Sequence, residues 1–431
     1  MAMLTGRYPH KQSLWTNDDM LASDLPTHAH ALGASGYRPI LAGRLHALGP
    51  DQHHGYVERY VGDHSPNWPG APVRGMGELA GTNGPNRVSI DKSGPGQSAY
   101  ELLDADTCEA ALQQLEIAAQ RDDDEPFALT VGFMLPHAPY VATKEDFERF
   151  SDCVPDTVVK RPDDNDEHPW INEWRSLRNI ERVSDEDAYR TRAAYFGLTY
   201  RLDRNIGKIL DRLDELGLAD NTLVIYSTDH GDHVGERELW WKHTFFEDSV
   251  KIPLIMRLPG VLPAGERRDA TLTLLDVTAT MLDAAQAPAL PSIDGRSFWS
   301  LACDGKTRWQ HAAFSEYCTT DFEPFGGKFR QQRMIRKDNL KLVYYNDYPP
   351  QLFDLEADPF EHTNLAGDSA YSKTLRQLEE ELLHGWNPTK IEEVMREKQR
   401  VTRIIGDWAA TTQPANVIRW PLAEEQNYLY S

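Results

Sequence analysis

The sequence predicts an α/β fold in which helices sandwich a large, mostly parallel sheet, followed by a smaller C-terminal α+β subdomain. Apolar runs of strand length alternate with segments whose apolar residues recur at helical spacing, the pattern of a parallel sheet covered by helices. The chain has 431 residues, 40% of them hydrophobic, enough for a large buried core. We expect one domain at residues 1–305 and a subdomain with a small antiparallel sheet and a terminal arm at residues 306–431.

Three strands are expected in the large domain. They are residues 37–42, 127–133 (FALTVGF) and 222–227 (TLVIYS). The second ends in Pro136-His137-Ala138-Pro139, since proline interrupts a sheet ladder, and the third is expected to be a buried central strand that delivers Asp229 and His230 at its carboxyl end. Sites in open α/β sheets lie at that end of the strands, so the polar residues there are the candidates for function.

Helices are expected between these strands. Thr27 is a suitable N-cap for a short helix that runs to Gly36, and residues 185–216 form a long amphipathic helix that ends at Gly217. In the subdomain, residues 341–345 resemble a strand and residues 375–383 a helix. The stretch after Trp408 has no strong periodicity, and we expect an arm that could reach a neighbouring subunit, which leaves a homo-oligomer open.

Composition excludes some classes of function. The net charge of −22, from 45 basic and 67 acidic residues, argues against a nucleic-acid partner. The four cysteines form no C-x-x-C pair, so neither a zinc ribbon nor a disulfide framework is expected, and most should be buried thiols. The first twenty residues do not resemble a signal peptide, and there is no apolar run of membrane-spanning length. We therefore expect a cytoplasmic protein without a membrane partner.

The strongest local signal is Ser227-Thr228-Asp229-His230-Gly231-Asp232. A carboxylate beside an imidazole at a strand end can bind a divalent metal, and this oxygen and nitrogen pair suits Mn²⁺ somewhat better than Ca²⁺, which prefers oxygen alone. The competing interpretation is an Asp that caps the next turn beside a surface His, and for the motif in isolation it is the more common one.

Three other segments carry cationic or titratable groups. Arg44 and His46 follow the first expected strand, His137 lies between two prolines after the second, and Lys242 ends Leu239-Trp240-Trp241-Lys242. Separately, each has a structural explanation: an ion pair for the arginine, a solvated or core histidine, a lysine extending along aromatic surface. Together they would surround one anion. Trp240 and Trp241 could likewise stack on a sugar or cage a quaternary ammonium, or simply pack in the core.

These segments occur in the order found in the sulfatase family, which the chain resembles over nearly its whole length. The matching segments are Leu4 to Lys11 (LTGRYPHK), Gly36-Tyr37 with Gly43-Arg44-Leu45-His46, Leu135 to Pro139 (LPHAP), Asp229-His230-Gly231, Lys242, Phe246-Glu247, Ile252 to Ile255 (IPLI), and Leu352 to Pro359 (LFDLEADP) with Asn364-Leu365. The segment Gly49 to Gly55 and the block from Trp240 to Phe246 are most similar to the choline-sulfatase branch.

The resemblance implies an alkaline-phosphatase-like fold and hydrolysis of a small-molecule sulfate monoester by a formylglycine hydrate, assisted by one divalent ion, Ca²⁺ or Mn²⁺. Asp229 and His230 match metal ligands. Lys242 and His137 match groups that hold the sulfate and assist the departing oxygen, and His46 matches the residue that helps the sulfated intermediate collapse. A phosphodiesterase or phosphonate monoester hydrolase of the same superfamily is the nearest alternative.

Two departures from the family pattern stand out. Residues 1–6 align just after the family signature C-x-P-S-R, and no cysteine of this chain has that context. We therefore expect a domain without its first strand and nucleophile motif, inactive as written, through a misplaced start codon or, alternatively, as a non-catalytic remnant. The other departure is Arg44, where the family usually has lysine. Its charge persists, but a planar guanidinium makes different contacts from an ammonium.

Overall fold

The computed structural model describes residues 1–71, 75–121, 125–162, 167–320 and 328–430. The chain forms two compact units, each assembled from separate stretches of sequence. Unit 1 comprises residues 1–35, 225–231 and 243–408, and unit 2 comprises residues 36–224, 232–242 and 409–431. Because the units are discontinuous in sequence, they do not test the expected boundary near residue 305, which stays a prediction.

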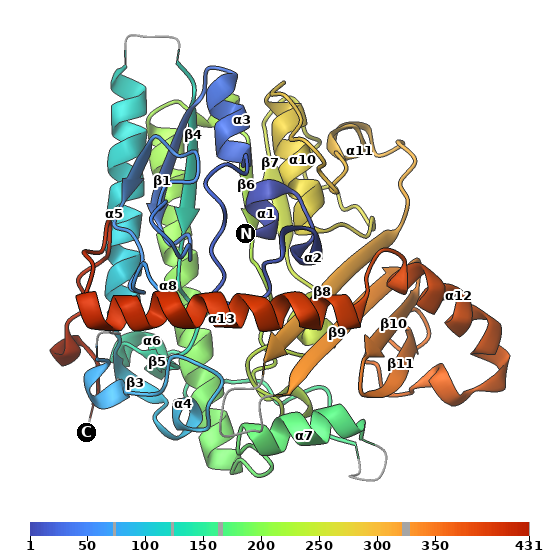
Figure 1. Ribbon diagram of the computed structural model, residues 1–431. Coiled ribbons are helices and arrows are strands. Elements are labelled where there is room, and N and C mark those ends of the chain that lie inside the picture. Colours follow the sequence, from blue (N-terminus) through green and yellow to red (C-terminus); the bar gives the residue numbers. More distant parts are fainter. Residues whose placement is uncertain (72–74, 122–124, 163–166, 321–327, 431) are drawn as a thin grey trace. The chain divides into compact units, whose positions relative to one another are not determined.

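Unit 2 is built around a parallel sheet in the order β2-β1-β4. Strands β1 and β4 of this sheet are labelled in Figure 1. Its elements are β1 (Arg38–Gly43), β2 (Glu58–Tyr60), α4 (Val88–Asp91), β3 (Gly94–Gln97), α5 (Ala99–Gln120), β4 (Phe127–Gly132), β5 (Val141–Ala142), α6 (Lys144–Glu148), α7 (Pro169–Leu177), α8 (Asp185–Glu215) and β12 (Tyr428–Leu429). Helix α5 packs on β1, β4 and α8, and the apolar face of α8 contributes Leu198 and Leu202 to the core. The expected strands at 37–42 and 127–133 are thus confirmed as β1 and β4.

Local sequence explains the bounds of the long helix α8. Ser184 caps it by accepting the N–H of Asp187, and three acidic residues fill its first turn, where the helix dipole favours negative charge. The chain leaves the helix through Gly217 at φ +70°, a left-handed conformation that glycine adopts without steric cost. The helix predicted over 185–216 is therefore confirmed to within one residue.

Unit 1 contains an antiparallel sheet in the order β11-β10-β9-β8, with α12 packed on it (Figure 1). Its elements are α1 (Ala2–Thr5), α2 (Pro9–Gln12), α3 (His28–Ala34), β6 (Val224–Ser227, from Ile225 on), α9 (Glu247–Val250), β7 (Leu254–Arg257), α10 (Leu274–Ala284), α11 (Trp299–Asp304), β8 (Ala312–Thr320), β9 (Phe329–Lys337), β10 (Leu340–Tyr345), β11 (Tyr348–Asp354), α12 (Ser372–Leu383) and most of α13 (Pro388–Thr412). The expected strand at 341–345 and helix at 375–383 are confirmed.

Several expectations need correction. The strand at 222–227 is β6, which is half-buried rather than fully buried, because β7 is its only ladder partner among the described residues. The helix capped by Thr27 ends at Ala34, two residues before Gly36. Two of the four cysteines, Cys153 and Cys303, are not buried.

The C-terminal region also differs from the expectation. Helix α13 continues to Thr412, beyond the Trp408 at which regular structure was expected to end. Further on, the backbone N–H of Trp420 donates to the carbonyl of Asp63, and Tyr428 and Leu429 pair with β3. The stretch expected as an arm therefore pairs within unit 2. Among the described helices, none is both long and apolar enough to cross a bilayer.

A buried ion cluster joins the antiparallel sheet to α9 in unit 1. The Lys341 side chain is fully buried, its Nζ lies 2.9 Å from Glu247 Oε1, and it also pairs with Glu361. Glu361 in turn accepts the backbone N–H of Glu247 at 2.8 Å. Burial raises the pKa of the Glu361 carboxyl, while the charge of Lys341 acts against this rise. The stability of the cluster therefore depends on the buried ammonium group of Lys341.

We expect Lys341→Met to lower the free energy of unfolding by about 3–5 kcal/mol, because it leaves the buried carboxylate of Glu361 without its counter-ion. Glu247 is partly exposed and keeps Arg336 at 3.6 Å. Urea unfolding measures this loss. Lys337→Met is the matched control on the neighbouring strand, since Lys337 pairs with Glu381 at a partly exposed position and should cost less than about 1 kcal/mol. Equal losses in the two variants would contradict the importance of burial.

Candidate active site

The ends of β1 and β4 bring two predicted segments together. The strands run parallel with Gly43 opposite Gly132, and the N–H of Arg44 donates to the carbonyl of Gly132 at 2.9 Å. A Cβ on Gly132 would lie 2.1 Å from the carbonyl oxygen of Arg44, so this approach of the backbones requires glycine. The residues that follow each strand, including His46 and His137, therefore leave the sheet at the same edge.

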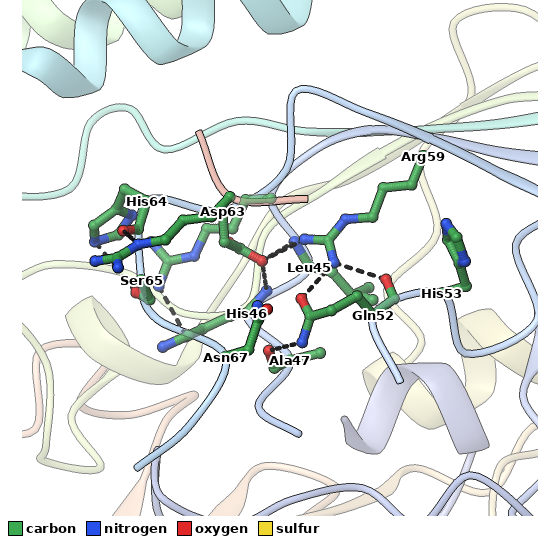
Figure 2. A network of polar contacts seen from close by, with 12 residues as sticks. Leu45, His46, Ala47, Gln52, His53, Arg59, Asp63, His64, Ser65 and Asn67 are labelled. Carbon is green, nitrogen blue, oxygen red and sulfur yellow. Dashed lines mark hydrogen bonds and ion pairs between the residues drawn. The ribbon is translucent and has the colours of Figure 1, made fainter. Parts of the chain in front are cut away.

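Asp63 holds the loop that carries His46 (Figure 2). Its Oδ2 accepts the backbone N–H of His46 at 3.0 Å and that of Leu45 at 3.3 Å, and it forms an ion pair with Arg59 at 2.5 Å. His46 adopts φ +56°, a conformation that is uncommon for residues other than glycine and needs such support. Burial would raise the pKa of the Asp63 carboxyl, but Arg59 and Arg44 hold it below its ordinary value.

Gln52 connects Arg59 to the segment that directly follows His46 in the chain. Arg59 Nη1 donates to the side-chain oxygen of Gln52 at 2.8 Å and to its carbonyl at 2.7 Å. The Gln52 amide then donates to the carbonyls of Ala47 and Gly49. The backbone on either side of His46 is therefore fixed by one connected set of buried polar groups (Figure 2).

Arg44 sets the proton position on His46. Its Nη2 lies 2.8 Å from His46 Nδ1, and because a guanidinium only donates, Nδ1 accepts and the ring proton of the neutral imidazole is on Nε2. Burial first, and then the charge of Arg44, lower the pKa of His46 to about 3, with Lys242 acting in the same direction. His46 is thus a neutral hydrogen-bond donor at Nε2 near pH 7, and Lys242 lies close enough to affect its charge.

The neutrality of His46 leads to a pH prediction. In the unfolded chain this histidine takes up a proton below its ordinary pKa of 6.5, whereas in the folded protein it stays neutral down to about pH 3. Its contribution to stability is present above pH 6.5 and is lost on acidification, by about 1.4 kcal/mol for each pH unit. We expect His46→Gln to weaken the acid dependence of the urea midpoint between pH 6.5 and 4. An unchanged dependence would contradict a neutral His46.

His137 has the opposite tautomer. Its Nδ1 lies 2.7 Å from the carbonyl oxygen of Ala138, which only accepts, so Nδ1 carries a proton and Nε2 is the nitrogen that can gain or lose the other. The preceding turn is held by Asp104 of α5, which accepts the N–H groups of Met134 at 2.7 Å and Leu135 at 2.9 Å. Burial raises the pKa of Asp104 to about 7. His137 is therefore suited to deliver a proton from Nε2.

Tyr100 and His64 connect the two histidine segments, and the sequence analysis missed both. The Tyr100 hydroxyl lies 2.9 Å from His64 Nε2, and its ring centroid is 6.2 Å from that of His137. Burial and then the charge of Arg44 lower the pKa of His64 to about 4. The sequence signal was present, because Asp63-His64 repeats the D-H pairing of Asp229-His230, but no expected strand placed it at a site.

Asp229 and His230 belong to unit 1, where they follow β6. His230 Nδ1 donates to the carbonyl of Gly231 at 2.8 Å, so its Nε2 has the lone pair, 3.5 Å from Asp229 Oδ2. One carboxylate oxygen and one imidazole nitrogen so placed fit a first-row divalent ion. The Met1 amino group interacts electrostatically with Asp229. In the part of the chain that the structure describes, no cluster of three or more His, Cys, Asp or Glu side chains is arranged around a metal position.

The structure therefore places Arg44 in contact with His46, with Lys242 near enough for its charge to lower the pKa of His46. Tyr100 contacts both His64 and His137, and all of these residues lie in unit 2. Cationic and proton-carrying side chains here lie at the carboxyl edge of a parallel sheet. A hydrolase that acts on an ester of a tetrahedral oxyanion needs this kind of arrangement. The roles of the individual residues stay predictions.

Sequence comparisons identify the family. The "Sulfatase" family profile matches residues 1–287, and that of "N-sulphoglucosamine sulphohydrolase, C-terminal" matches residues 235–387. The choline-sulfatase of Rhizobium meliloti (strain 1021) is 32% identical over 381 residues, which cover 85% of this chain and 72% of that protein. The chain belongs to the sulfatase family, and its class is that of hydrolases acting on sulfate esters.

Further matches extend this assignment. The multifunctional alkaline phosphatase superfamily protein PehA of Trinickia caryophylli is 30% identical over 287 residues, covering 61% of this chain and 55% of that protein. Among solved structures, a phosphonate monoester hydrolase from Silicibacter pomeroyi superposes with a TM-score of 0.69 at 23% identity, covering 89% of this chain and 84% of that one. The expected alkaline-phosphatase-like α/β fold is confirmed.

Proposed function

We propose that the protein hydrolyses a small-molecule sulfate monoester. The observation that carries the proposal is the grouping of Arg44, His46 and Lys242, connected to His137, where β1 and β4 end. Transfer of a sulfuryl group between oxygens needs fixed positive charge around it and a proton for the leaving alkoxide, and this set offers both.

The role of each residue follows from its charge and from which of its nitrogen atoms carry protons. Lys242 holds the sulfate oxygens with a compact positive charge, and His46 donates from Nε2 to the same group. His137, when its ring is doubly protonated, gives the Nε2 proton to the departing oxygen and becomes neutral, while its Nδ1–H stays on the carbonyl of Ala138. Arg44 acts first through His46, by keeping the ring proton on Nε2.

Two groups from outside these side chains complete the proposal. A divalent ion, Ca²⁺ or Mn²⁺, would be held by Asp229 and His230 and would supply charge neutralisation for the sulfate oxygens. A formylglycine would supply the nucleophile, and the sequence contains no C-x-P-S-R from which one could form. An in-frame C-x-P-S-R in the genomic DNA immediately before the Met1 codon supports an active enzyme, whereas an interrupted frame there supports a remnant.

Choline sulfate is the first substrate to test, because the match to a choline-sulfatase covers most of this chain. Trp240 and Trp241 do not supply an exposed cage for its quaternary ammonium. Their exposures are 1% and 4%, and the Trp241 indole N–H donates to Ser89. They are core residues, as the packing interpretation of the sequence expected.

Hydrolysis of a phosphonate monoester or phosphodiester is the second candidate, favoured by the likeness to the phosphonate monoester hydrolase structure. A substrate panel separates the two, assayed with added Ca²⁺ or Mn²⁺ on the chain expressed with any in-frame upstream sequence. It contains choline, aryl and sugar sulfates, a phosphonate monoester and a phosphodiester. We expect the highest kcat/KM for a sulfate ester. Preference for a phosphorus ester would favour the second candidate, and no turnover would favour a non-catalytic remnant.

Cytoplasmic location and self-association also stay proposals.

A further inference from the structure

Asp232, the last residue of the Ser227 to Asp232 motif, connects two segments of the site in unit 2. Its Oδ2 accepts the hydroxyl proton of Tyr140 at 2.7 Å. Its Oδ1 accepts the N–H of Trp241 at 2.9 Å and that of Val234 at 3.0 Å. Tyr140 comes three residues after His137, and Trp241 immediately precedes Lys242. One carboxylate therefore bridges the chain next to Lys242 and the chain just after His137.

The loop that Asp232 closes has a backbone that needs such support. Val234, Arg237, Glu238 and Trp241 all have positive φ, between +45° and +61°. Non-glycine residues in this region cost on the order of 1–3 kcal/mol each and persist only where their surroundings hold them. Two of the three donors to Asp232 are the N–H groups of Val234 and Trp241, residues of this set. The carboxylate thus holds the loop at both ends.

The other side of the bridge is rigid. Tyr140 is fully buried, and its ring packs against Tyr195 and Trp240 at centroid distances of 6.1 and 6.3 Å. Backbone pairing adds to the closure, because the N–H of His233 donates to the carbonyl of Trp241 at 2.8 Å. Arg192 of α8 also donates to the carbonyl of Val234. Asp232 and Tyr140 therefore anchor the backbone next to Lys242 to the core of unit 2.

We propose that Asp232, together with Tyr140, is a positioning residue that fixes Lys242 relative to His137 for sulfate-ester hydrolysis. This inference rests on the proposed function. Both Asp232 oxygens already accept donors from the protein, so the role is one of holding and not of contact with the substrate. A displacement of a binding group by about 1 Å can lower a rate by about 10²-fold, so the expected effect is large although Asp232 does not touch the ester.

A double-mutant cycle tests the link between Asp232 and Lys242. We expect Asp232→Ala to lower kcat/KM by about 10²-fold in the wild-type background but by less than about 3-fold in the Lys242→Ala background, because residues that act through one another are not additive. Asp232→Asn should retain much of the activity, since its side-chain oxygen can still accept the two N–H groups and its amide can donate to Tyr140. Equal losses in the two backgrounds overturn the proposal.

Hydrogen exchange of the full chain, followed by mass spectrometry, tests the same proposal without requiring activity. Asp232→Ala, and more weakly Tyr140→Phe, should speed amide exchange in residues 233–242 and leave α5 unchanged. Glu238→Gln is the matched control, because this exposed carboxylate of the same loop pairs only loosely with Arg161, at 3.5 Å. Unchanged exchange at 233–242 in Asp232→Ala overturns the inference whatever the activity. If Asp232→Ala does not fold, Tyr140→Phe makes the comparison, because it removes the hydroxyl that donates to Asp232, and Asp232→Asn serves as the control that keeps the hydrogen bonds.

The two experiments separate failure of the inference from failure of the proposed function. If the chain expressed with its in-frame upstream sequence hydrolyses no ester but the exchange of residues 233–242 responds as expected, the proposed function fails and the holding role of Asp232 stands. If the wild-type chain is an active sulfatase and neither the exchange nor the cycle responds, the function stands and the inference fails.

Discussion

Replacing Lys242 with alanine is expected to lower kcat for sulfate-ester hydrolysis by about 10²–10³-fold, the usual loss for one fixed donor to a developing oxyanion. Lys242 is half-buried at the end of the loop closed by Asp232, and its charge lowers the pKa of His46. The attraction between a cation held in that position and the sulfate grows as negative charge develops on the sulfate and its leaving oxygen in the transition state. Steady-state kinetics on the preferred sulfate ester measures the loss.

Lys251→Ala is the control for this variant, because Lys251 is an exposed lysine a few residues further along the chain. We expect its kinetics to match those of the wild type. Circular dichroism and the urea midpoint of Lys242→Ala should stay close to wild type, since a partly exposed lysine contributes little to the core. Full activity in Lys242→Ala would remove this residue from the mechanism.

The second large effect is expected at Asp63, on stability and activity together. The Asp63 and Arg59 side chains are 6% and 0% exposed, and Asp63→Ala leaves the guanidinium buried without its counter-ion. Breaking a buried pair in this way costs about 3–5 kcal/mol. The backbone N–H of His46 loses its acceptor as well, so kcat should fall with the free energy of unfolding.

Urea unfolding measures the stability loss, and Asp91→Ala is the control. Asp91 forms an ion pair with Arg87 at an exposed position, where we expect a cost below about 1 kcal/mol. The carboxyl of Asp63 has a lowered pKa in the folded protein, so its contribution is present at neutral pH and is lost as the pH falls through that value. A similar cost in both variants would show that the network around His46 is not a source of stability.

The strands and long helices were predictable because their signals are local. The apolar run at 127–133 and the helical spacing over 185–216 lie within continuous stretches, and β4 and α8 follow them closely. The ends of parallel strands meet at one edge, which is enough to bring His46 and His137 near each other. Helix α13 was not among the predicted helices, although Ile391 and Met395, and then Ile404 and Trp408, recur at helical spacing within it.

The supporting residues could not be predicted from the sequence alone. Asp63 holds the His46 backbone from 17 positions away, and Asp104 holds the turn before His137 from about 30 positions away. Contacts of this kind have no periodicity, since they depend on how loops return to the strand ends. The same is true of Asp232, which was noted only as the last residue of the motif whose predicted metal ligands are Asp229 and His230. Its oxygens accept a tyrosine hydroxyl and two backbone N–H groups.

The most direct measurement is the rate at which an amine-reactive reagent labels Lys242, followed by peptide mass spectrometry with and without inorganic sulfate. If Lys242 lines an anion site beside His46, sulfate slows the labelling of Lys242 and leaves that of Lys251 unchanged, and His137→Ala reduces the protection. Equal labelling of Lys242 in the presence and absence of sulfate would contradict the convergence of these residues on one oxyanion.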